Sequence, residues 1–295
     1  MPRFLAILLF CLLPNLGQAA RLHVVLVPSG NAPPYRSFSD TFRQSLQGNI
    51  QFEEVKPESF TGREKADLVV AVGVRAADIA VKKTDLPIIA AMLPSYVYAA
   101  LKSVRPTGLS AIFVDQPWER QASFLRLAFP ERRQIGMLVS SVPHLDFDKL
   151  RTALQANGDN LNSETVTQGA LFEKLEQVLA RSQILLALPD NAIYNSNSIR
   201  DILLSSYRHR VPLVGFSEAF VNAGALCAIY STAEQLAAQA GSMVNGYAKG
   251  GVLPDAEYPK MYTVLVNQEV AGMLGIAMPS KELLVLKLER ERAIR

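Results

Sequence analysis

Residues 67–92 decide the fold and read DLVVAVGVRAADIAVKKTDLPIIAAM. After its first residue, Asp67–Val72 is continuously apolar, which is typical of a parallel strand covered on both faces. Apolar residues at helical spacing follow over Ala76–Lys82, and Pro87–Met92 is a second buried run. Strand, helix and strand in this order predict a βαβ unit and therefore a parallel sheet.

The same alternation continues along the chain on both sides of this unit. Eight further runs are strand candidates: Leu22–Val27, Ile50–Val55, Leu109–Val114, Gln134–Val139, Ile184–Leu188, Val211–Phe216, Ala225–Tyr230 and Tyr262–Val266. The other helix candidates are Ser37–Gln47, Pro117–Leu127, Asp146–Gln155, Leu171–Arg181, Asn197–Tyr207 and Ala233–Ala248, and Lys281–Arg295 is expected to end as a helix or tail. For a chain of 295 residues, this pattern predicts an α/β protein with two lobes, each built on a parallel sheet of about five strands.

The first twenty residues form a separate segment. Arg3 precedes the apolar run Phe4–Leu13, and small residues surround Ala19 and Ala20. This pattern predicts a signal peptide over residues 1–20, cleaved after Ala19 or Ala20, and export to the periplasm. The apolar run is too short for a membrane span of about 20 residues. No other stretch approaches 18 consecutive apolar residues, so we expect a mature chain that is not embedded in a membrane.

Composition excludes several classes of function. The chain has 49% hydrophobic and 19% charged residues, which predicts a folded core, and its formal charge of +3 comes without a basic block that would favour nucleic acid. Two cysteines are too few for a disulfide scaffold or a cysteine-based zinc site. The nucleotide-binding glycine motifs and the His-Glu-x-x-His zinc motif are absent from the sequence. We therefore expect neither a cofactor nor a metal.

Candidate ligand-binding residues lie just after the strands, because open parallel sheets bind ligands beyond the carboxyl ends of their strands. They are Asn31, Arg75, Ser95, Tyr96, Asp115, Asp190, Asn191, Tyr194, Ser217 and Glu218. Arg75 opens a helix and is expected to hold an anionic group. Asp190 and Glu218 are expected to receive a cationic or hydroxyl group, and Tyr96 or Tyr194 to cover an apolar part of the ligand.

Each of these residues also has a structural interpretation. Arg75 can pair with a surface carboxylate, and Asp190 or Asn191 can cap the following helix. The stretch Gly215–Ala219 resembles a nucleophile elbow around Ser217, which would make the protein a serine hydrolase. No histidine follows Ser217 in the sequence, and a serine without its base is a poor nucleophile, so this alternative is remote.

Two late stretches carry a family resemblance. Residues 224–240 read GALCAIYSTAEQLAAQA, and residues 264–279 read VLVNQEVAGMLGIAMP. Together with Asp67–Gly73, Pro189–Asn191 and Phe216–Glu218, they resemble the ABC-transporter substrate-binding family of the type I periplasmic-binding fold. Better-known members of this family bind tryptophan or tyrosine.

The resemblance implies two Rossmann-like lobes joined by three crossings near Val114, Tyr230 and Tyr258, with the ligand between them. Residues 21–114 and 230–257 would form the N-terminal lobe, and residues 115–229 and 258–295 the C-terminal lobe. It further implies a non-enzymatic monomer that captures a small molecule by hinge closure for an ABC-type permease.

This chain departs from its relatives at Gly73–Ala76 and Leu93–Tyr96. The ligand is therefore expected only to be amino-acid-like or a small organic acid. A ligand-sensing or interaction protein without a transport role is the alternative, and genes for a permease and an ATPase beside this one would argue against it.

Overall fold

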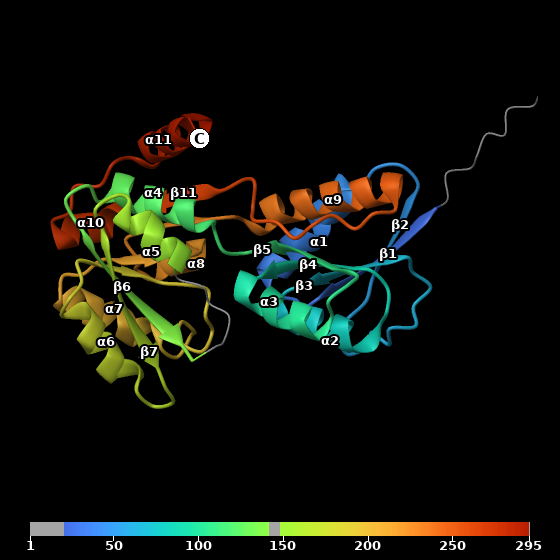
Figure 1. Cartoon of the computed structure of the whole chain (residues 1–295), viewed down its shortest axis with the longest axis horizontal. Coiled ribbons are helices and arrows are strands. Elements are labelled where there is room, and N and C mark those ends of the chain that lie inside the picture. Colours follow the sequence, from blue (N-terminus) through green and yellow to red (C-terminus); the bar gives the residue numbers. More distant parts are fainter. Residues whose placement is uncertain (1–20, 142–147, 295) are drawn as a thin grey trace, which may run out of the picture.

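We analysed a computed structural model of the chain, which describes residues 21–141 and 148–294. The predicted signal peptide, residues 1–20, lies outside the described residues. Two α/β lobes lie side by side along the long axis of the molecule (Figure 1). The α/β architecture with two sheets of mostly parallel strands confirms the predicted fold class.

The first sheet has five parallel strands in the order β2-β1-β3-β4-β5. They are β1 (Leu22–Pro28), β2 (Ile50–Glu54), β3 (Leu68–Val72), β4 (Ile88–Leu93) and β5 (Leu109–Phe113). Helices α1 (Pro33–Ser45), α2 (Val74–Lys83) and α3 (Ser95–Val104) belong to the same lobe. Alternate residues of β1 enter two different buried clusters, Val24 and Leu26 in one and Val25 and Val27 in the other. Burial on both faces explains why these strands are continuously apolar.

The second sheet has six strands in the order β11-β10-β9-β8-β6-β7. They are β6 (Gln134–Ser140), β7 (Asn160–Val166), β8 (Ile184–Leu186), β9 (Leu213–Gly215), β10 (Cys227–Tyr230) and β11 (Thr263–Val266). Among the strands that the structure describes in this sheet, β10 and β11 form the one antiparallel pair. Its lobe contains α4 (Trp118–Ala128), α5 (Asp148–Gln155), α6 (Leu171–Leu179), α7 (Ile199–Arg208), α8 (Glu218–Ala223), α10 (Gln268–Leu274) and α11 (Lys281–Ile294).

Four elements were not predicted from the sequence. Strand β7 lies at the edge of its sheet, and its residues alternate between exposed and half-buried, so it lacks the apolar run of a central strand. Helices α8 and α10 are short and follow strands closely. Helix α3 also follows a strand closely, and it has no fully buried residue to mark a helical stripe. The helix expected over Asp146–Gln155 begins at Asp148 where the structure describes it, and Asp146 lies outside the described residues.

Helix α9 (Ala233–Gly250) comes late in the chain and packs on the first sheet. In Figure 1 it lies beside α1, an orange helix among blue elements. Leu236, Ala240 and Val244 of α9 enter the same buried cluster as Val24 of β1. The chain therefore passes between the lobes after β5, after β10 and again between α9 and β11.

Hydrogen bonds join these three crossing segments to one another. Gln116, after β5, donates its Nε2 to the Ser231 Oγ at 3.0 Å. Ser231, after β10, donates its hydroxyl to the Met261 carbonyl oxygen, just before β11, at 2.6 Å. Within the described ranges, no helix is both long enough and apolar enough to cross a membrane.

Candidate functional site

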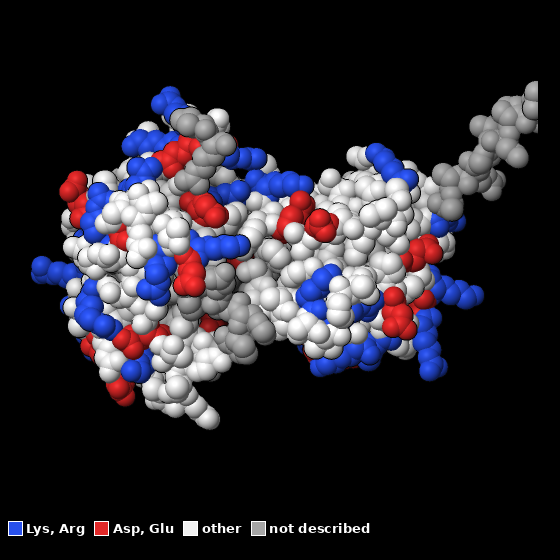
Figure 2. Space-filling view, in the orientation of Figure 1, with Lys and Arg blue, Asp and Glu red and all other residues white. Residues whose placement is uncertain are grey.

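A cavity of 580 Å³ lies between the lobes. The space-filling view shows the waist at which the lobes meet (Figure 2). Residues from both lobes line the cavity: Ser29, Tyr35, Val74, Arg75, Asp78, Met92, Pro94, Tyr96, Val114, Pro189 and Asn191. Most of them follow the carboxyl ends of β1, β3, β4 and β5, and the last two follow β8. The cavity thus takes the position in which parallel sheets bind ligands.

The end of β1 and the start of α2 form one wall of this cavity. Ser29 accepts a hydrogen bond from the Ala76 backbone N–H through its Oγ at 3.0 Å, which satisfies one free donor of α2. Gly73 has φ +89°, and a Cβ built on it would lie 2.5 Å from the Ser29 Oγ and 2.9 Å from the Tyr35 hydroxyl. Only glycine therefore allows the Tyr35 phenol to approach this backbone so closely.

Arg75 lines the cavity and also pairs with a surface carboxylate. Its Nη2 lies 2.7 Å from the Glu58 Oε1, and the two side chains are 57% and 60% exposed. The structural interpretation of Arg75 is therefore confirmed, and anion binding by Arg75 stays a prediction that its place in the cavity lining permits. An exposed ion pair contributes little free energy, so an anionic ligand can compete with Glu58 for the guanidinium.

Ser95 and Asp115 hold the N-terminus of α3, where Tyr96 lies. The Asp115 carboxylate accepts from the Ser95 backbone N–H at 2.7 Å and from its hydroxyl at 2.6 Å. Burial raises the pKa of Asp115, and these hydrogen bonds oppose the shift. Neither residue lines the cavity. Together they fix the turn that presents the Tyr96 ring.

Tyr96 faces the second lobe across the cavity. Burial raises the pKa of its phenol to about 12, and the negative charges of Asp190 and Asp115 add to the shift. Asp190 belongs to the turn after β8, so its carboxylate acts on Tyr96 from the other lobe. The phenol is thus neutral at physiological pH and can donate a hydrogen bond to a ligand.

Asp190 is 5% exposed and holds its own turn together. Its Oδ2 accepts from the Ser140 backbone N–H at 3.1 Å, and its Oδ1 accepts from the Ala192 backbone N–H at 3.0 Å. These bonds tie the end of β6 to the turn after β8. Asp190 therefore does not cap the following helix as its structural interpretation expected, because α7 begins only at Ile199 and has Ser198 as its N-cap. Asn191, the next residue, is exposed and lines the cavity.

The remaining predicted residues lie away from the lining of this cavity. Tyr194 is buried against Phe216 and Phe220, with ring centroids 6.3 Å and 6.2 Å from its own, and burial raises its pKa. Ser217 is the N-cap residue of α8 and Glu218 its first residue. Asn31 is exposed, and its carbonyl oxygen accepts from the Arg36 Nη1 at 2.6 Å. The cavity therefore unites Arg75, Tyr96 and Asn191 from the predicted set.

Met92 is a cavity residue that the sequence analysis missed. It has a positive φ of 54° at the end of β4, where the register with β5 shifts between Ala91 and Leu93. A residue other than glycine in this conformation is strained, and such strain concentrates at functional sites. No residue type in the sequence signals it, because methionine is an ordinary strand residue.

Two observations concern metal-ligating and nucleophilic side chains among the described residues. No group of three or more His, Cys, Asp or Glu among them could hold a metal ion. Cys227 is buried, and burial raises the pKa of its thiol, which disfavours the nucleophilic thiolate.

Comparison with known proteins agrees with this geometry. A family model described as "ABC transporter substrate binding protein" matches residues 58–290. The search of curated proteins finds no match.

Three solved structures resemble the chain over most of its length. A conserved domain protein from Vibrio cholerae is 19% identical, with a TM-score of 0.64, covering 90% of this chain and 98% of its own. The ABC domain from Streptococcus pneumoniae in complex with L-Trp is 17% identical, with a TM-score of 0.67 and the same coverage. The open, ligand-free substrate-binding protein with adhesive properties from Clostridium difficile is 17% identical, with a TM-score of 0.68, covering 88% and 97%. At these identities the likeness concerns the fold.

Proposed function

Because this chain belongs to the ABC transporter substrate-binding family and has the two-lobed type I periplasmic-binding fold, we propose that it captures a small solute by hinge closure and delivers it to an ABC-type permease. The observation that carries the proposal is the cavity between the lobes, with Arg75 and Tyr96 on one side and Asn191 on the other. A ligand that touches both lobes favours the closed form, because only that form makes both sets of contacts.

The proposed boundaries of the two lobes lie where the chain passes from one lobe to the other. Residues 21–114 and 230–257 form the N-terminal lobe, and residues 115–229 and 258–295 form the C-terminal lobe. The packing of α9 on the first sheet supports the return to the N-terminal lobe after β10. Residues 1–20 are the proposed signal peptide, and the mature protein works as a monomer in the periplasm.

The ligand is amino-acid-like or a small organic acid. The Arg75 guanidinium receives its carboxylate, since its present partner Glu58 is an exposed surface residue. Tyr96 and Tyr35 cover an apolar part of the ligand, and Asn191 closes on it from the second lobe. The complex of the Streptococcus pneumoniae protein with L-Trp supports a ligand of this size and class.

Glu218 remains a candidate for a cationic group of the ligand. It is exposed at the start of α8, beyond the end of β9. Asp190, by contrast, is already committed to two backbone N–H groups, so its part in binding is to hold the turn that presents Asn191.

A thermal-shift screen of residues 21–295 against amino acids, small organic acids and nucleosides tests the proposal. A ligand at about 100 times its Kd adds roughly 2.7 kcal/mol to the free energy of unfolding, so a true ligand gives a clear shift. The absence of a shift with every solute would contradict solute binding.

The role of Arg75 is tested with the best ligand from this screen. Arg75→Gln removes the guanidinium and should weaken binding of a carboxylate ligand about tenfold or more, because a charge-assisted hydrogen bond contributes on the order of 1.5–3 kcal/mol. Arg63→Gln is the matched control, since Arg63 lies outside the cavity lining. Equal affinity of the two variants would exclude Arg75 as the anion-binding group.

The transport role and the sensing role can be distinguished by measuring uptake of the ligand into cells. If the protein serves an importer, deleting its gene abolishes uptake of the radiolabelled ligand, and a plasmid copy restores it. Unchanged uptake would favour the sensing role instead.

A further inference from the structure

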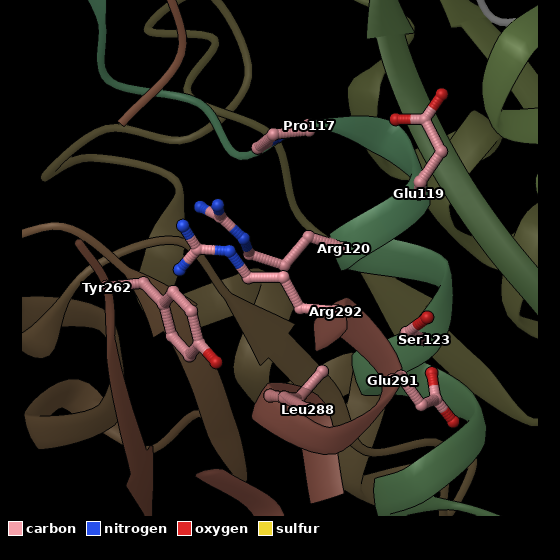
Figure 3. A pocket seen from close by; sticks show the side chains of 8 residues that line it. All are labelled: Pro117, Glu119, Arg120, Ser123, Tyr262, Leu288, Glu291 and Arg292. Atoms are coloured by element: carbon pink, nitrogen blue, oxygen red, sulfur yellow. The ribbon is translucent and has the colours of Figure 1, made fainter. Parts of the chain in front are cut away.

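A second cavity, of 180 Å³, lies in the C-terminal lobe, away from the cleft between the lobes. It is an open cavity lined by residues of α4 and α11, by Pro117 and by Tyr262, which directly precedes β11, and Figure 3 shows these side chains. The guanidinium groups of Arg120 from α4 and Arg292 from α11 lie next to each other beside the ring of Tyr262 (Figure 3). The Arg120 Cζ is 4.7 Å from the centroid of that ring.

Arg120 lacks an acidic partner among the residues that the structure describes. Its Nη1 donates to the Gln116 Oε1 at 2.6 Å and to the Pro259 carbonyl oxygen at 2.9 Å, and both acceptors are neutral. Burial lowers the pKa of Arg120, and the like charge of Arg292 adds to this shift, while Tyr262 and Glu289 oppose it. The half-buried guanidinium is therefore held by neutral hydrogen-bond acceptors, and Glu289 acts on its charge without forming an ion pair with it.

The acidic residues near the cavity are directed elsewhere. Glu291 pairs with Arg126, and in Figure 3 the carboxylates of Glu119 and Glu291 point away from the two guanidinium groups. Glu289 accepts the Tyr262 hydroxyl through Oε1 at 2.5 Å, and its Oε2 lies 3.8 Å from the Arg292 Nη1. The two guanidinium groups thus share one cavity, and the Glu289 carboxylate, which is ion-paired with Arg292, offsets part of their charge.

We propose that this cavity is a binding site for a small oxyanion of the phosphate type, held between the guanidinium groups of Arg120 and Arg292. Two planar guanidinium forks match the several oxygens of such an anion, and each hydrogen bond is charge-assisted. The volume accommodates the anion with some water, since one water occupies about 30 Å³ of liquid. The bound anion relieves the repulsion between the two arginines, which supplies part of the binding free energy.

The position of the site links α11 to the crossing segments. Pro117 lines the cavity just before α4, and Arg120 also binds the Pro259 carbonyl oxygen in the crossing between α9 and β11. An anion that joins Arg120 to Arg292 therefore fastens the last helix to the side of the hinge. The site shares no lining residue with the cleft, so it is independent of the proposed solute.

Isothermal titration of the whole mature protein with inorganic phosphate, at constant ionic strength set by sodium chloride, tests the site. We expect saturable binding by the unaltered protein and at least tenfold weaker binding by Arg292→Gln. Arg290→Gln is the matched control, because it removes the same charge from the same helix at an exposed position outside the cavity lining. Arg75→Gln, which alters the cleft, should bind phosphate normally.

Arg120→Gln should also weaken phosphate binding, and Arg292→Gln decides the question if this variant fails to fold. The proposal is overturned if phosphate does not bind, if Arg290→Gln weakens binding as much as Arg292→Gln, or if Arg75→Gln abolishes it. The last result would place the anion in the cleft and would leave the proposed solute-binding function standing.

Discussion

At the scale of single residues, Asp190 shows how a cleft is held in shape by a group that need not touch the ligand. Its carboxylate accepts two backbone N–H groups, from Ser140 and Ala192, while it is almost fully buried. Asp190→Ala leaves both donors without their acceptor, which should lower the free energy of unfolding by on the order of 2–3 kcal/mol in urea denaturation.

Asn191→Ala is the control for this substitution, because Asn191 is exposed and lies next to Asp190. Its free energy of unfolding should stay within about 0.5 kcal/mol of the unaltered protein, while affinity for the cleft ligand falls. If both variants lose equal stability, the buried carboxylate does not hold the turn.

The close packing around Gly73 leads to a second prediction at the scale of single residues. Gly73→Ala introduces a Cβ at φ +89°, within 3 Å of the Ser29 Oγ and the Tyr35 hydroxyl. Strain at such a backbone angle costs about 1–3 kcal/mol, and Tyr35 must move away from the cavity wall. Chemical denaturation measures the loss, and ligand titration measures the change in the cavity.

Gly272→Ala provides the comparison for Gly73→Ala. Gly272 lies inside α10, where an added Cβ would meet no atom within 4 Å. Alanine there should leave stability unchanged or raise it by up to about 1 kcal/mol, because alanine favours the helix. Equal behaviour of the two variants would remove the argument for close approach at Gly73.

Part of the candidate site could be predicted from the sequence, because apolar runs show where the strands end. Arg75, Tyr96 and Asn191 follow runs that predict strands, and all three line the cavity. The hydrogen bonds by which Asp115 and Asp190 hold their turns could not be predicted from the sequence. Their partners Ser95 and Ser140 lie 20 and 50 residues away in the chain.

At the scale of elements, burial at the N-terminus of α3 shifts the pKa of a tyrosine and makes stability depend on pH. Tyr96 has a pKa raised from about 10 to about 12, mainly by burial. The folded state therefore holds the phenol proton more tightly than the unfolded state does. The stabilisation from Tyr96 is complete below pH 10 and is lost as the pH rises towards 12.

Tyr96→Phe lacks this ionisation, so its free energy of unfolding should fall less steeply above pH 10 than that of the unaltered protein. Urea denaturation between pH 8 and pH 11 measures both curves, which should run parallel below pH 9. Parallel curves over the whole range would show that the phenol titrates normally in the folded chain.

Strands and helices were predictable where burial leaves a clear apolar pattern in the sequence, and they were missed where it does not. The central strands β1, β3 and β4 are buried on both faces, and their apolar runs mark them clearly. Strand β7 reads NLNSETV and has a neighbour only on the side of β6, so its sequence keeps the polar residues of an edge. Helix α3 contains three residues of low helix propensity in Tyr96, Val97 and Tyr98. Its first backbone N–H is bound by Asp115, 20 residues later in the chain, so no local cap marks the helix in the sequence.

At the scale of the whole molecule, the three crossings form one hydrogen-bonded unit. Arg120 donates to Gln116, Gln116 donates to Ser231, and Ser231 donates to the Met261 carbonyl oxygen. These bonds lie between the lobes and bind neither sheet to the other directly. In the proposed hinge closure, the lobes would rotate about these segments while the hydrogen bonds keep the three segments in register.

The proposed hinge closure predicts that ligand binding makes the molecule more compact, because a ligand held by residues of both lobes must bring the lobes together. The radius of gyration from small-angle X-ray scattering should decrease when the best solute from the thermal-shift screen is present at saturation. Asn191→Ala at the same solute concentration should show a smaller decrease, since it lacks the contact from the second lobe. A ligand that binds tightly without any decrease in the radius of gyration would contradict hinge closure and would place its contacts on one lobe alone.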